Sequence, residues 1–545
     1  MANYSKIYLT FILIFVSLMG FGQDRYVVKY KYKPNSTFNL NEPETFLTPK
    51  AIERREKERI LPDSTDLPVS PKYIQQVKPL VKRVNYHLKW FNASVVVADE
   101  GQVADLEKLP FVKEVELIAN KFHEQEISAQ SSILKLPLKI KLKSNTEEDY
   151  ALQNNLLGIP EMHQEGLTGN GLTIAVFDAG FLNTDKIDGM KHLFDNNQII
   201  TARDFVTPWS ENVFRSETHG TSSLSLIAAN DQNTLVSGAY DANYILCITE
   251  DVSSEFRVEE YNWARAAEYA DSLGVDIINS SLGYNHFDDP AMNYSKEALD
   301  GKTAVISQAA FMAGEKGILV VSSVGNSGGN TNTTLTAPAD AKGILAVGAV
   351  TLDLNRASFS SVGPTADGRI KPDLMALGDG VRLWRVQNGT STASGTSFSA
   401  PQITALAAGI WQGRPHWTKD ELIDYLLKSG SQAENPDSYF GYGIPDFFVA
   451  YQGEITGEEI VPEKFETVIY PNPTDGNQLY IKFGHMDTCD FTIYDTSGKV
   501  LAHNILYRSS NKIPYEASLT SFSSGVYIIQ LSEGILRERH KLFIQ

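Results

Sequence analysis

The sequence predicts an α/β protein whose central part is a parallel sheet flanked by helices, with an α+β unit before it and a β-sandwich after it. Three observations indicate this order. Short apolar runs such as Leu172–Phe177 have the pattern of buried strands, and helical segments rich in small residues separate them. Strand and helix patterns alternate between Arg25 and about Asn120. Beyond Tyr451, only short alternating runs split by turns remain.

The first residues have the pattern of an export signal. Lys6 precedes an apolar run from Ile7 to Val16, and small residues follow up to Gly22, near an expected cleavage point. The apolar run is shorter than the roughly 20 residues that a membrane-spanning helix needs. We therefore expect residues 1–23 to be a signal peptide, and the chain to be exported with no transmembrane anchor.

Residues 24–120 form the α+β unit, whose pattern suits a split βαβ arrangement. Its strand, helix, strand, helix and strand are expected at Tyr26–Tyr32, Pro71–Lys82, Asn92–Ala98, Gly101–Leu109 and Val112–Ile118. Residues 121–147 are a linker, in which Lys135–Lys143 alternates apolar and basic residues. The whole chain is acidic, with a formal net charge of −18. We therefore expect a linker or edge strand there, and no nucleic-acid partner.

The most informative motif is the segment Gly395–Pro401, which reads GTSFSAP. Gly395 and Thr396 make a tight turn, a helix begins after it, and Pro401 suits the first helical turn. Ser397 therefore stands at a helix N-terminus, where free N–H groups and the helix dipole favour negative charge. Such a serine can attack a carbonyl and leave the oxyanion stabilised. The alternative is an ordinary N-capping serine.

Two more residues complete the chemistry that a nucleophilic serine needs. A hydroxyl is a poor nucleophile without a base, and the base needs a group that orients it. Asp178 ends the buried strand that begins at Leu172, at the edge where open α/β sheets place their sites. His219 opens a helix-like segment rich in small residues. Either residue alone would more often be structural, but with Ser397 they make a catalytic triad.

The order Asp178, His219, Ser397 and the motifs around these residues resemble the subtilisin-like serine protease family, peptidase S8. Asp178-Ala179-Gly180, His219-Gly220-Thr221 and the serine motif correspond to its three motifs. The resemblance covers about residues 150–451. The departures from the family pattern are Ala179 and Val362, both outside the triad.

This resemblance implies a subtilisin-like sheet over residues 148–452 and a serine endopeptidase. Ser397 would form the acyl-enzyme, His219 would act as base and then as acid, and Asp178 would hold the imidazole. Residues 24–120 would be a propeptide that inhibits the enzyme and assists its folding. Such assistance has a physical reason, because parallel sheets depend on non-local pairing and fold slowly.

The same resemblance implies roles for three further places. Asn326 follows the buried run Gly317–Val321 and would donate, with the backbone N–H of Ser397, to the tetrahedral oxyanion. The segments that would line the substrate site are Ser281-Leu282-Gly283 and Ser323-Val324-Gly325. Pairing with an extended backbone gives affinity with little sequence preference, so the substrate would be a polypeptide. The alternative is that these segments are strand ends followed by polar turns.

After an acidic linker at residues 453–465, residues 466–545 contain short alternating runs that predict a small β-sandwich. Tyr470–Pro473, Gly525–Tyr527 and the terminal Lys541-Leu542 resemble the C-terminal sorting domain of the type IX secretion system. This implies the type IX secretion machinery as a partner, and delivery through the periplasm to the outside or to the cell surface. The alternative is an accessory domain that binds substrate or carbohydrate.

No cofactor is expected from the sequence, which has no zinc-ligand spacing and no phosphate-binding loop. Cys247 and Cys489 fall in different expected domains, so we expect both to be free or buried and non-catalytic. Structural calcium often stabilises enzymes of the resembled family. The scattered acids Asp288, Asp289 and Asp300 form no loop pattern that assigns such a site.

Two other function classes stay open at this stage. A catalytically silent surface or adhesive protein could reuse the fold, although the intact triad and Asn326 count against it. An esterase on an α/β-hydrolase scaffold would carry serine, acid and histidine in that order, whereas Ser397 comes last here. Acylation by a fluorophosphonate probe would separate an active enzyme from a silent protein.

Overall fold

The computed structural model describes most of the chain, and the expected signal peptide and both expected linkers lie almost wholly outside the described residues. The described ranges are 23–34, 36–122, 148–210, 212–215, 217–329, 333–386, 389–452, 468–474, 476, 478–482, 488–495, 499–507, 515–533 and 536–545. They divide into two units, which are described separately. One unit spans residues up to 157 and 166–446, and the other spans 158–165 and 447–545.

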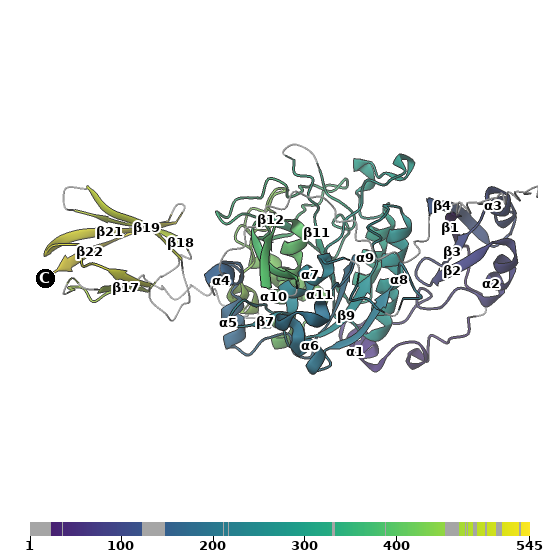
Figure 1. Ribbon diagram of the computed structural model, residues 1–545, viewed down its shortest axis with the longest axis horizontal. Helices are drawn as coiled ribbons and strands as arrows, with labels where there is room; N and C mark the ends of the chain where they lie inside the picture. The colour runs from purple at the N-terminus through teal and green to yellow at the C-terminus, as the bar shows by residue number, and fades with distance from the viewer. Residues whose placement is uncertain are drawn as a thin grey trace, which may run out of the picture. The chain divides into compact units, whose positions relative to one another are not determined.

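A seven-stranded parallel sheet forms the centre of the first unit (Figure 1). Its strands in spatial order are β13 (Leu374–Leu377), β12 (Leu345–Val350), β11 (Leu319–Ser323), β10 (Ile277–Ser280), β5 (Thr173–Asp178), β9 (Asn243–Ile248) and β6 (Ile199–Asp204). Every residue of β5, β10, β11, β12 and β13 is buried, as a parallel sheet covered on both faces requires. The predicted α/β class is therefore confirmed.

Helices cover both faces of this sheet. They form two pairs, α8 (Val258–Leu273) with α9 (Val305–Glu315), and α7 (His219–Ala228) with α10 (Thr396–Gly413). Successive side chains of a strand point to opposite faces. Ser280 of β10 accepts a hydrogen bond from Trp263 of α8, at 3.0 Å. Its neighbour Asn279 accepts one from Thr404 of α10, at 2.9 Å. The two helix pairs therefore lie on opposite faces of the sheet.

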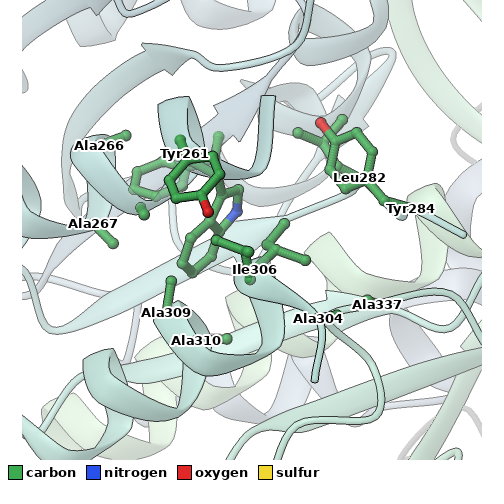
Figure 2. Packing of buried hydrophobic residues seen from close by; sticks show 14 of the residues in the cluster. Tyr261, Ala266, Ala267, Leu282, Tyr284, Ala304, Ile306, Ala309, Ala310 and Ala337 are labelled. Atoms are coloured by element: carbon green, nitrogen blue, oxygen red, sulfur yellow. The ribbon is translucent and has the colours of Figure 1, made fainter. Parts of the chain in front are cut away.

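The α8–α9 face holds an extended apolar cluster of the first unit. In Figure 2, Tyr261, Ala266 and Ala267 of α8 lie around the same interior as Ile306 and Ala309 of α9, and all five are buried. The small alanines let the two helices approach each other and the sheet closely. This cluster continues, without a break, into residues of the N-terminal sheet.

The N-terminal part of the first unit is a four-stranded antiparallel sheet with its own helices (Figure 1). In spatial order the strands are β2 (Arg83–Leu88), β3 (Ala93–Val97), β1 (Gln23–Tyr30) and β4 (Val112–Phe122), and the helices beside them are α2 (Pro71–Val77) and α3 (Glu100–Glu107). The helix between β1 and α2 in the sequence, α1 (Pro49–Lys57), lies away from this sheet and contacts α8 (Figure 1). The sheet order, with β1 between β3 and β4, matches the predicted split βαβ arrangement. The sequence patterns missed β2 and α1.

Alternation along the strands gives this small sheet two apolar faces. Tyr26 and Val28 of β1 pack with α2 and α3 in one cluster. Val27, between them, belongs to the other face, which packs against α8 and α9. Glu268 of α8 accepts hydrogen bonds from the backbone N–H groups of Lys89, at 3.0 Å, and Trp90, at 2.8 Å. The N-terminal sheet is therefore fixed to the helices by both apolar packing and hydrogen bonds.

The second unit contains two antiparallel sheets around one apolar core. One sheet has the order β16 (Val468–Tyr470), β17 (Gln478–Lys482), β20 (Tyr515–Ser518), and the other has the order β19 (Val500–Tyr507), β18 (Thr488–Tyr494), β21 (Gly525–Glu533), β22 (Leu536–Ile544). Leu479 and Ile481 of the first sheet share the core with Phe491 and Leu531 of the second. Two sheets with a common core confirm the predicted β-sandwich.

The remaining elements connect or flank these parts. The helices are α4 (Glu148–Asn155), α5 (Ile159–Gln164), α6 (Lys191–Asp195), α11 (Lys419–Lys428) and α12 (Phe447–Tyr451), with 3₁₀ turns at Pro43–Thr45, Lys78–Leu80, Thr184–Lys186, Asp188–Met190, Pro290–Met292 and Lys296–Ala298. The strands are β7 (Asn230–Asp231), β8 (Leu235–Val236), β14 (Val381–Val386) and β15 (Gly389–Ala393). Across the described ranges, no helix has the length and apolar character that crossing a membrane requires.

Candidate active site

Asp178 is the last residue of β5, and its side chain is fully buried at the carboxyl edge of the sheet. A buried carboxylate needs partners. One oxygen accepts hydrogen bonds from the backbone of Ala179, at 2.8 Å, and contacts Nδ1 of His219, also at 2.8 Å. The other oxygen accepts from the hydroxyl of Ser223, at 3.0 Å. These contacts fix the carboxylate in one orientation, facing the imidazole.

His219 is the first residue of α7, and its side chain is 31% exposed. When Nδ1–H donates to Asp178, the neutral ring keeps a lone pair on Nε2, as a general base requires. Burial lowers the pKa of His219, but the negative charges of Asp178 and Glu250 outweigh burial and raise that pKa above its ordinary value. The imidazolium is therefore stabilised in the position where it would form during catalysis.

Close backbone approach holds this pair together. A Cβ atom at Gly220 would meet Cβ of Asp178 at 2.9 Å, and the backbone oxygen of Gly180 at 2.5 Å. Real Cβ atoms do not come so near, so only glycine lets the start of α7 lie against the end of β5. Gly180 of the aspartate motif and Gly220 of the histidine motif therefore belong to one close contact, between the residues after β5 and the start of α7.

Ser397 is the second residue of α10 and is almost buried. The helix starts at Thr396, so Pro401 lies inside the helix and not in its first turn, which corrects the expectation from the motif. Because proline has no N–H, the carbonyl of Ser397 lacks its usual partner four residues on. The hydroxyl of Ser281 donates to that carbonyl instead, at 2.9 Å. Pro401 and Ser281 thus tie the serine motif to the end of β10.

Asn326 follows β11 on the same edge, and its side-chain oxygen is held by Thr396. It accepts hydrogen bonds from the backbone N–H of Thr396, at 2.9 Å, and from its hydroxyl, at 3.1 Å. A Cβ at Gly395 would lie 3.0 Å from Oγ of Ser397 and 3.8 Å from Nδ2 of Asn326. Oγ of Ser397 and the amide nitrogen of Asn326 therefore face the same small space, which Gly395 keeps open.

The two expected substrate segments leave the sheet side by side, because β10 and β11 are parallel neighbours. Ser281 and Leu282 are buried, and Gly283 is exposed. Ser323 ends β11, and the side chain of Val324 is fully buried, so Val324 belongs to the core. Thr336 lies close to both Gly283 and Gly325.

Sequence reasoning missed three residues of this site. Thr396 orients Asn326, and Ser223 completes the partners of Asp178. Glu250 lies just after β9, and burial raises its pKa to about 7. Thr396 lies inside the serine motif, and Ser223 follows His219 by four residues, which is about one helical turn. Their spacing from Ser397 and His219 could therefore have identified both residues from the sequence. Nothing in the local pattern marks Glu250.

Glu250 belongs to a carboxylate cluster with Glu255 and Glu259, whose ligand atoms lie within 4.8 Å of one another. Burial raises the pKa of Glu255 to about 8, and Glu259 accepts a hydrogen bond from Tyr284 at 3.3 Å. Three carboxylates are a donor set that suits Ca²⁺. The three acids that the sequence analysis considered for calcium are not members of this cluster. Asp288, Asp289 and Asp300 each accept hydrogen bonds from backbone N–H groups.

Comparisons with known proteins agree with this geometry. The family model described as "Subtilase family" matches residues 169–443, half of the chain. The chain belongs to the subtilase family. The model of the peptidase S8 propeptide domain of Bacteroidota matches residues 25–132, and that of the secretion system C-terminal sorting domain matches residues 468–545. The chain is therefore a subtilase with a propeptide domain and a type IX sorting domain, and it is a secreted or cell-surface protein.

Similar proteins include Subtilisin NAT of Bacillus subtilis subsp. natto and Subtilisin E of Bacillus subtilis (strain 168). Each is 28% identical over 375 residues, which are 68% of this chain and 83% of the relative. Alkaline elastase YaB of Bacillus sp. (strain YaB) is 28% identical over a stretch that covers 53% of this chain and 67% of that relative. Among solved structures, MycP1 from the ESX-1 type VII secretion system is 22% identical with a TM-score of 0.46, over 58% of this chain and 89% of that chain.

Replacing Glu250 with Gln should lower the pKa of His219, because the imidazolium loses a nearby negative charge. The base acts in its neutral form, so the acid limb of kcat/KM against pH should move to lower pH. Arg385→Gln should move that limb to higher pH, because the positive charge of Arg385 opposes protonation of His219. Glu255→Gln serves as the control within the carboxylate cluster. Shifts of the same sign for Glu250→Gln and Arg385→Gln, or none at all, would contradict these charge assignments.

Proposed function

We propose that the chain is the precursor of a secreted serine endopeptidase (EC 3.4.21.-) that hydrolyses peptide bonds in proteins through an acyl-enzyme on Ser397. The observation that carries this proposal is the pair of Asp178 and His219, joined at 2.8 Å at the edge of the sheet where Ser397 is held. A buried carboxylate bound to Nδ1 sets the tautomer and orientation of a general base. Membership of the subtilase family supports the same function, that of a serine peptidase.

In the proposed reaction, Oγ of Ser397 attacks the carbonyl carbon of the substrate while Nε2 of His219 takes its proton. The tetrahedral intermediate collapses when His219 returns that proton to the leaving amine, which leaves the acyl-enzyme. A water molecule then gives a proton to His219 and attacks the ester, and His219 passes that proton to Oγ of Ser397 as the C–O bond breaks and the acid product is released. Asp178 stabilises the imidazolium in both halves of the reaction.

Asn326 and the backbone N–H of Ser397 would stabilise the oxyanion of each tetrahedral intermediate. Two contacts support this role. Thr396 engages the side-chain oxygen of Asn326, which leaves the amide nitrogen as the free donor, and that nitrogen faces the same space as Oγ of Ser397. Ser397 also lies in the first turn of α10, where backbone N–H groups have no partner within the helix.

The proposed precursor has six parts. These are a signal peptide (1–23), an inhibitory propeptide (24–120), a linker (121–147), the peptidase domain (148–452), an acidic linker (453–465) and the sorting domain (466–545). The polypeptide substrate would lie between the segments Ser281–Gly283 and Ser323–Gly325. Backbone groups of Gly283 and Gly325 are the accessible ones there, since Val324 is buried.

Ser397→Ala should abolish peptidase activity and fluorophosphonate labelling, because it removes only the nucleophile. If maturation is autocatalytic, residues 24–120 should also stay attached, which mass spectrometry of the purified protein measures. Ser394→Ala, an exposed serine three residues earlier, is the control and should process and cleave casein normally. Processing and casein cleavage by the Ser397→Ala protein would show that another residue is the nucleophile.

Asn326→Leu should lower kcat by roughly a hundredfold and change KM little, because the amide binds charge that develops only in the transition state. Steady-state kinetics on a peptide substrate measure the two constants. Leucine has a similar size, and thermal unfolding checks that the fold is kept. Ser327→Ala, an exposed neighbour, is the control. A rise in KM with unchanged kcat would assign Asn326 to ground-state binding.

Deleting Glu466–Gln545 should leave a folded, active protease that is no longer delivered outside the cell. The described strands of this segment have an apolar core of their own, so the deletion does not open the core of the peptidase domain. Activity should therefore accumulate in the periplasm and fall in the medium, which fractionation of the native host measures.

The same segment, placed behind a signal peptide and a fluorescent protein, should carry that protein out of the cell. A truncated enzyme that is secreted normally and fails only on bulky insoluble substrates would contradict a sorting role in this chain. The tail would then be a binding module.

A further inference from the structure

The two segments that would line the substrate site are joined by a third piece of chain, which contains Thr336. The backbone N–H of Thr336 donates to the carbonyl of Val324, at 3.1 Å. The next residue, Ala337, exchanges two backbone hydrogen bonds with Tyr284, at 3.0 and 2.8 Å. Val324 belongs to one substrate segment, and Tyr284 directly follows the other. Backbone hydrogen bonds on both sides therefore fix Thr336 between the two segments.

The side chain of Thr336 occupies the space between these segments. A Cβ atom at Gly325 would lie 2.8 Å from Oγ1 and 2.9 Å from Cγ2 of Thr336, and a Cβ atom at Gly283 would lie 2.9 Å from its Cβ. Ordinary contacts between carbon atoms are about 3.5–4.0 Å long, so neither glycine could carry even a methyl group. The hydroxyl of Thr336 donates to the carbonyl of Val324, at 3.4 Å, and only 7% of the residue is exposed. A held side chain thus fills this space.

The surroundings of Gly325 contain a second side chain that is held in the same way. Oγ of Ser361 would lie 3.0 Å from a Cβ at this glycine. The backbone N–H of Ser361 donates to the carbonyl of Gly325, at 3.0 Å, and its hydroxyl accepts from the backbone N–H of Ser327, at 3.1 Å. Two bonded side chains, those of Thr336 and Ser361, therefore crowd the same glycine and make this wall of the substrate site rigid.

Both substrate segments lie directly beside the candidate nucleophile. The hydroxyl of Ser281 donates to the carbonyl of Ser397, at 2.9 Å, and the hydroxyl of Thr396 donates to the carbonyl of Gly325, at 3.2 Å. When a substrate carbonyl stands at Oγ of Ser397, the side chain of that substrate residue starts two bonds away from the attacked carbon. The residue before the cut is therefore the one whose side chain would enter the space beside Thr336.

We propose that Thr336 restricts the peptidase to cleavage after residues with small side chains, which are glycine, alanine and serine. A leucine or phenylalanine side chain would have to displace Thr336, and forcing extra atoms into a close-packed, hydrogen-bonded place is unfavourable. The inference rests on the proposed function, because it names the substrate class of that same site.

The restriction comes from the size of the Thr336 side chain and not from its hydroxyl. Both the oxygen and the methyl group approach Gly325, and the hydroxyl is already bonded to Val324. Thr336→Gly removes Cβ, Oγ1 and Cγ2 and opens the space. Thr336→Val replaces the hydroxyl with a methyl group and leaves the space filled, so it is the matched control.

The test uses the enzyme as its native host secretes it, with a mixture of denatured proteins of known sequence as substrate. Mass spectrometry of the digest identifies the residue before each cut. The parent enzyme should cut mainly after glycine, alanine and serine, and Thr336→Gly should also cut after leucine and phenylalanine. With peptides that differ only at that residue, Thr336→Gly should raise kcat/KM for the phenylalanine peptide about tenfold or more. The value for the alanine peptide should change much less.

Two further variants control for size and for folding. Thr336→Val should cut after the same residues as the parent, and a relaxed preference in this variant would overturn a restriction by size. Thr336→Ala covers the case in which Thr336→Gly gives no folded enzyme, which thermal unfolding measures. It removes both γ atoms and keeps Cβ, so it should admit leucine.

Cleavage by the parent enzyme mainly after large residues would overturn the inference, as would an unchanged preference in Thr336→Gly and Thr336→Ala. Both outcomes leave the proposed function intact, because the enzyme still cuts proteins. A parent protein that neither cleaves casein nor reacts with a fluorophosphonate probe would instead contradict the proposed function, and the inference about Thr336 would fall with it.

Discussion

The parallel alignment of β5, β10 and β11 is the constraint on which the rest of the structure depends. It brings Asp178, Ser281 and Asn326 to one edge, although they lie far apart in the sequence. Two contacts tie the start of helix α10 to this edge, the bond from Ser281 to the carbonyl of Ser397 and the bonds between Thr396 and Asn326. The candidate site therefore depends on the register of these strands, which places its residues at one edge of the sheet.

Buried charge is used at both edges of this sheet, with different results. At the carboxyl edge, Asp178 faces a titratable imidazole, and its charge raises the pKa of His219. At the amino edge, Asp271 faces two guanidinium groups, which do not lose their protons. A buried carboxylate thus has a partner that can change its charge at one edge of the sheet, and partners that keep their charge at the other.

The sequence was most informative where chemistry restricts the residue type. The motifs around Asp178, His219 and Ser397 predicted the family, the α/β class and the order of the domains, because a nucleophile, a base and their glycines leave a dense local pattern. Contacts between distant segments could not be predicted. The bond from Ser281 to the carbonyl of Ser397 depends on the absent N–H of Pro401, whose place inside the helix appears only in the structure. Helix α1 was missed because its charged residues suggest an exposed segment, and only their buried partners explain them.

The position of α1 determines what removal of the N-terminal part would leave behind. If residues 24–120 are removed, as proposed, Asp271 and Asp276 lose Arg54, Arg55 and Lys50 as partners. Two carboxylates then remain near the C-terminal end of α8, where the helix dipole disfavours negative charge. Cleavage of the chain would therefore take ion pairs away from the amino edge of the sheet while leaving the hydrogen bonds at its carboxyl edge in place.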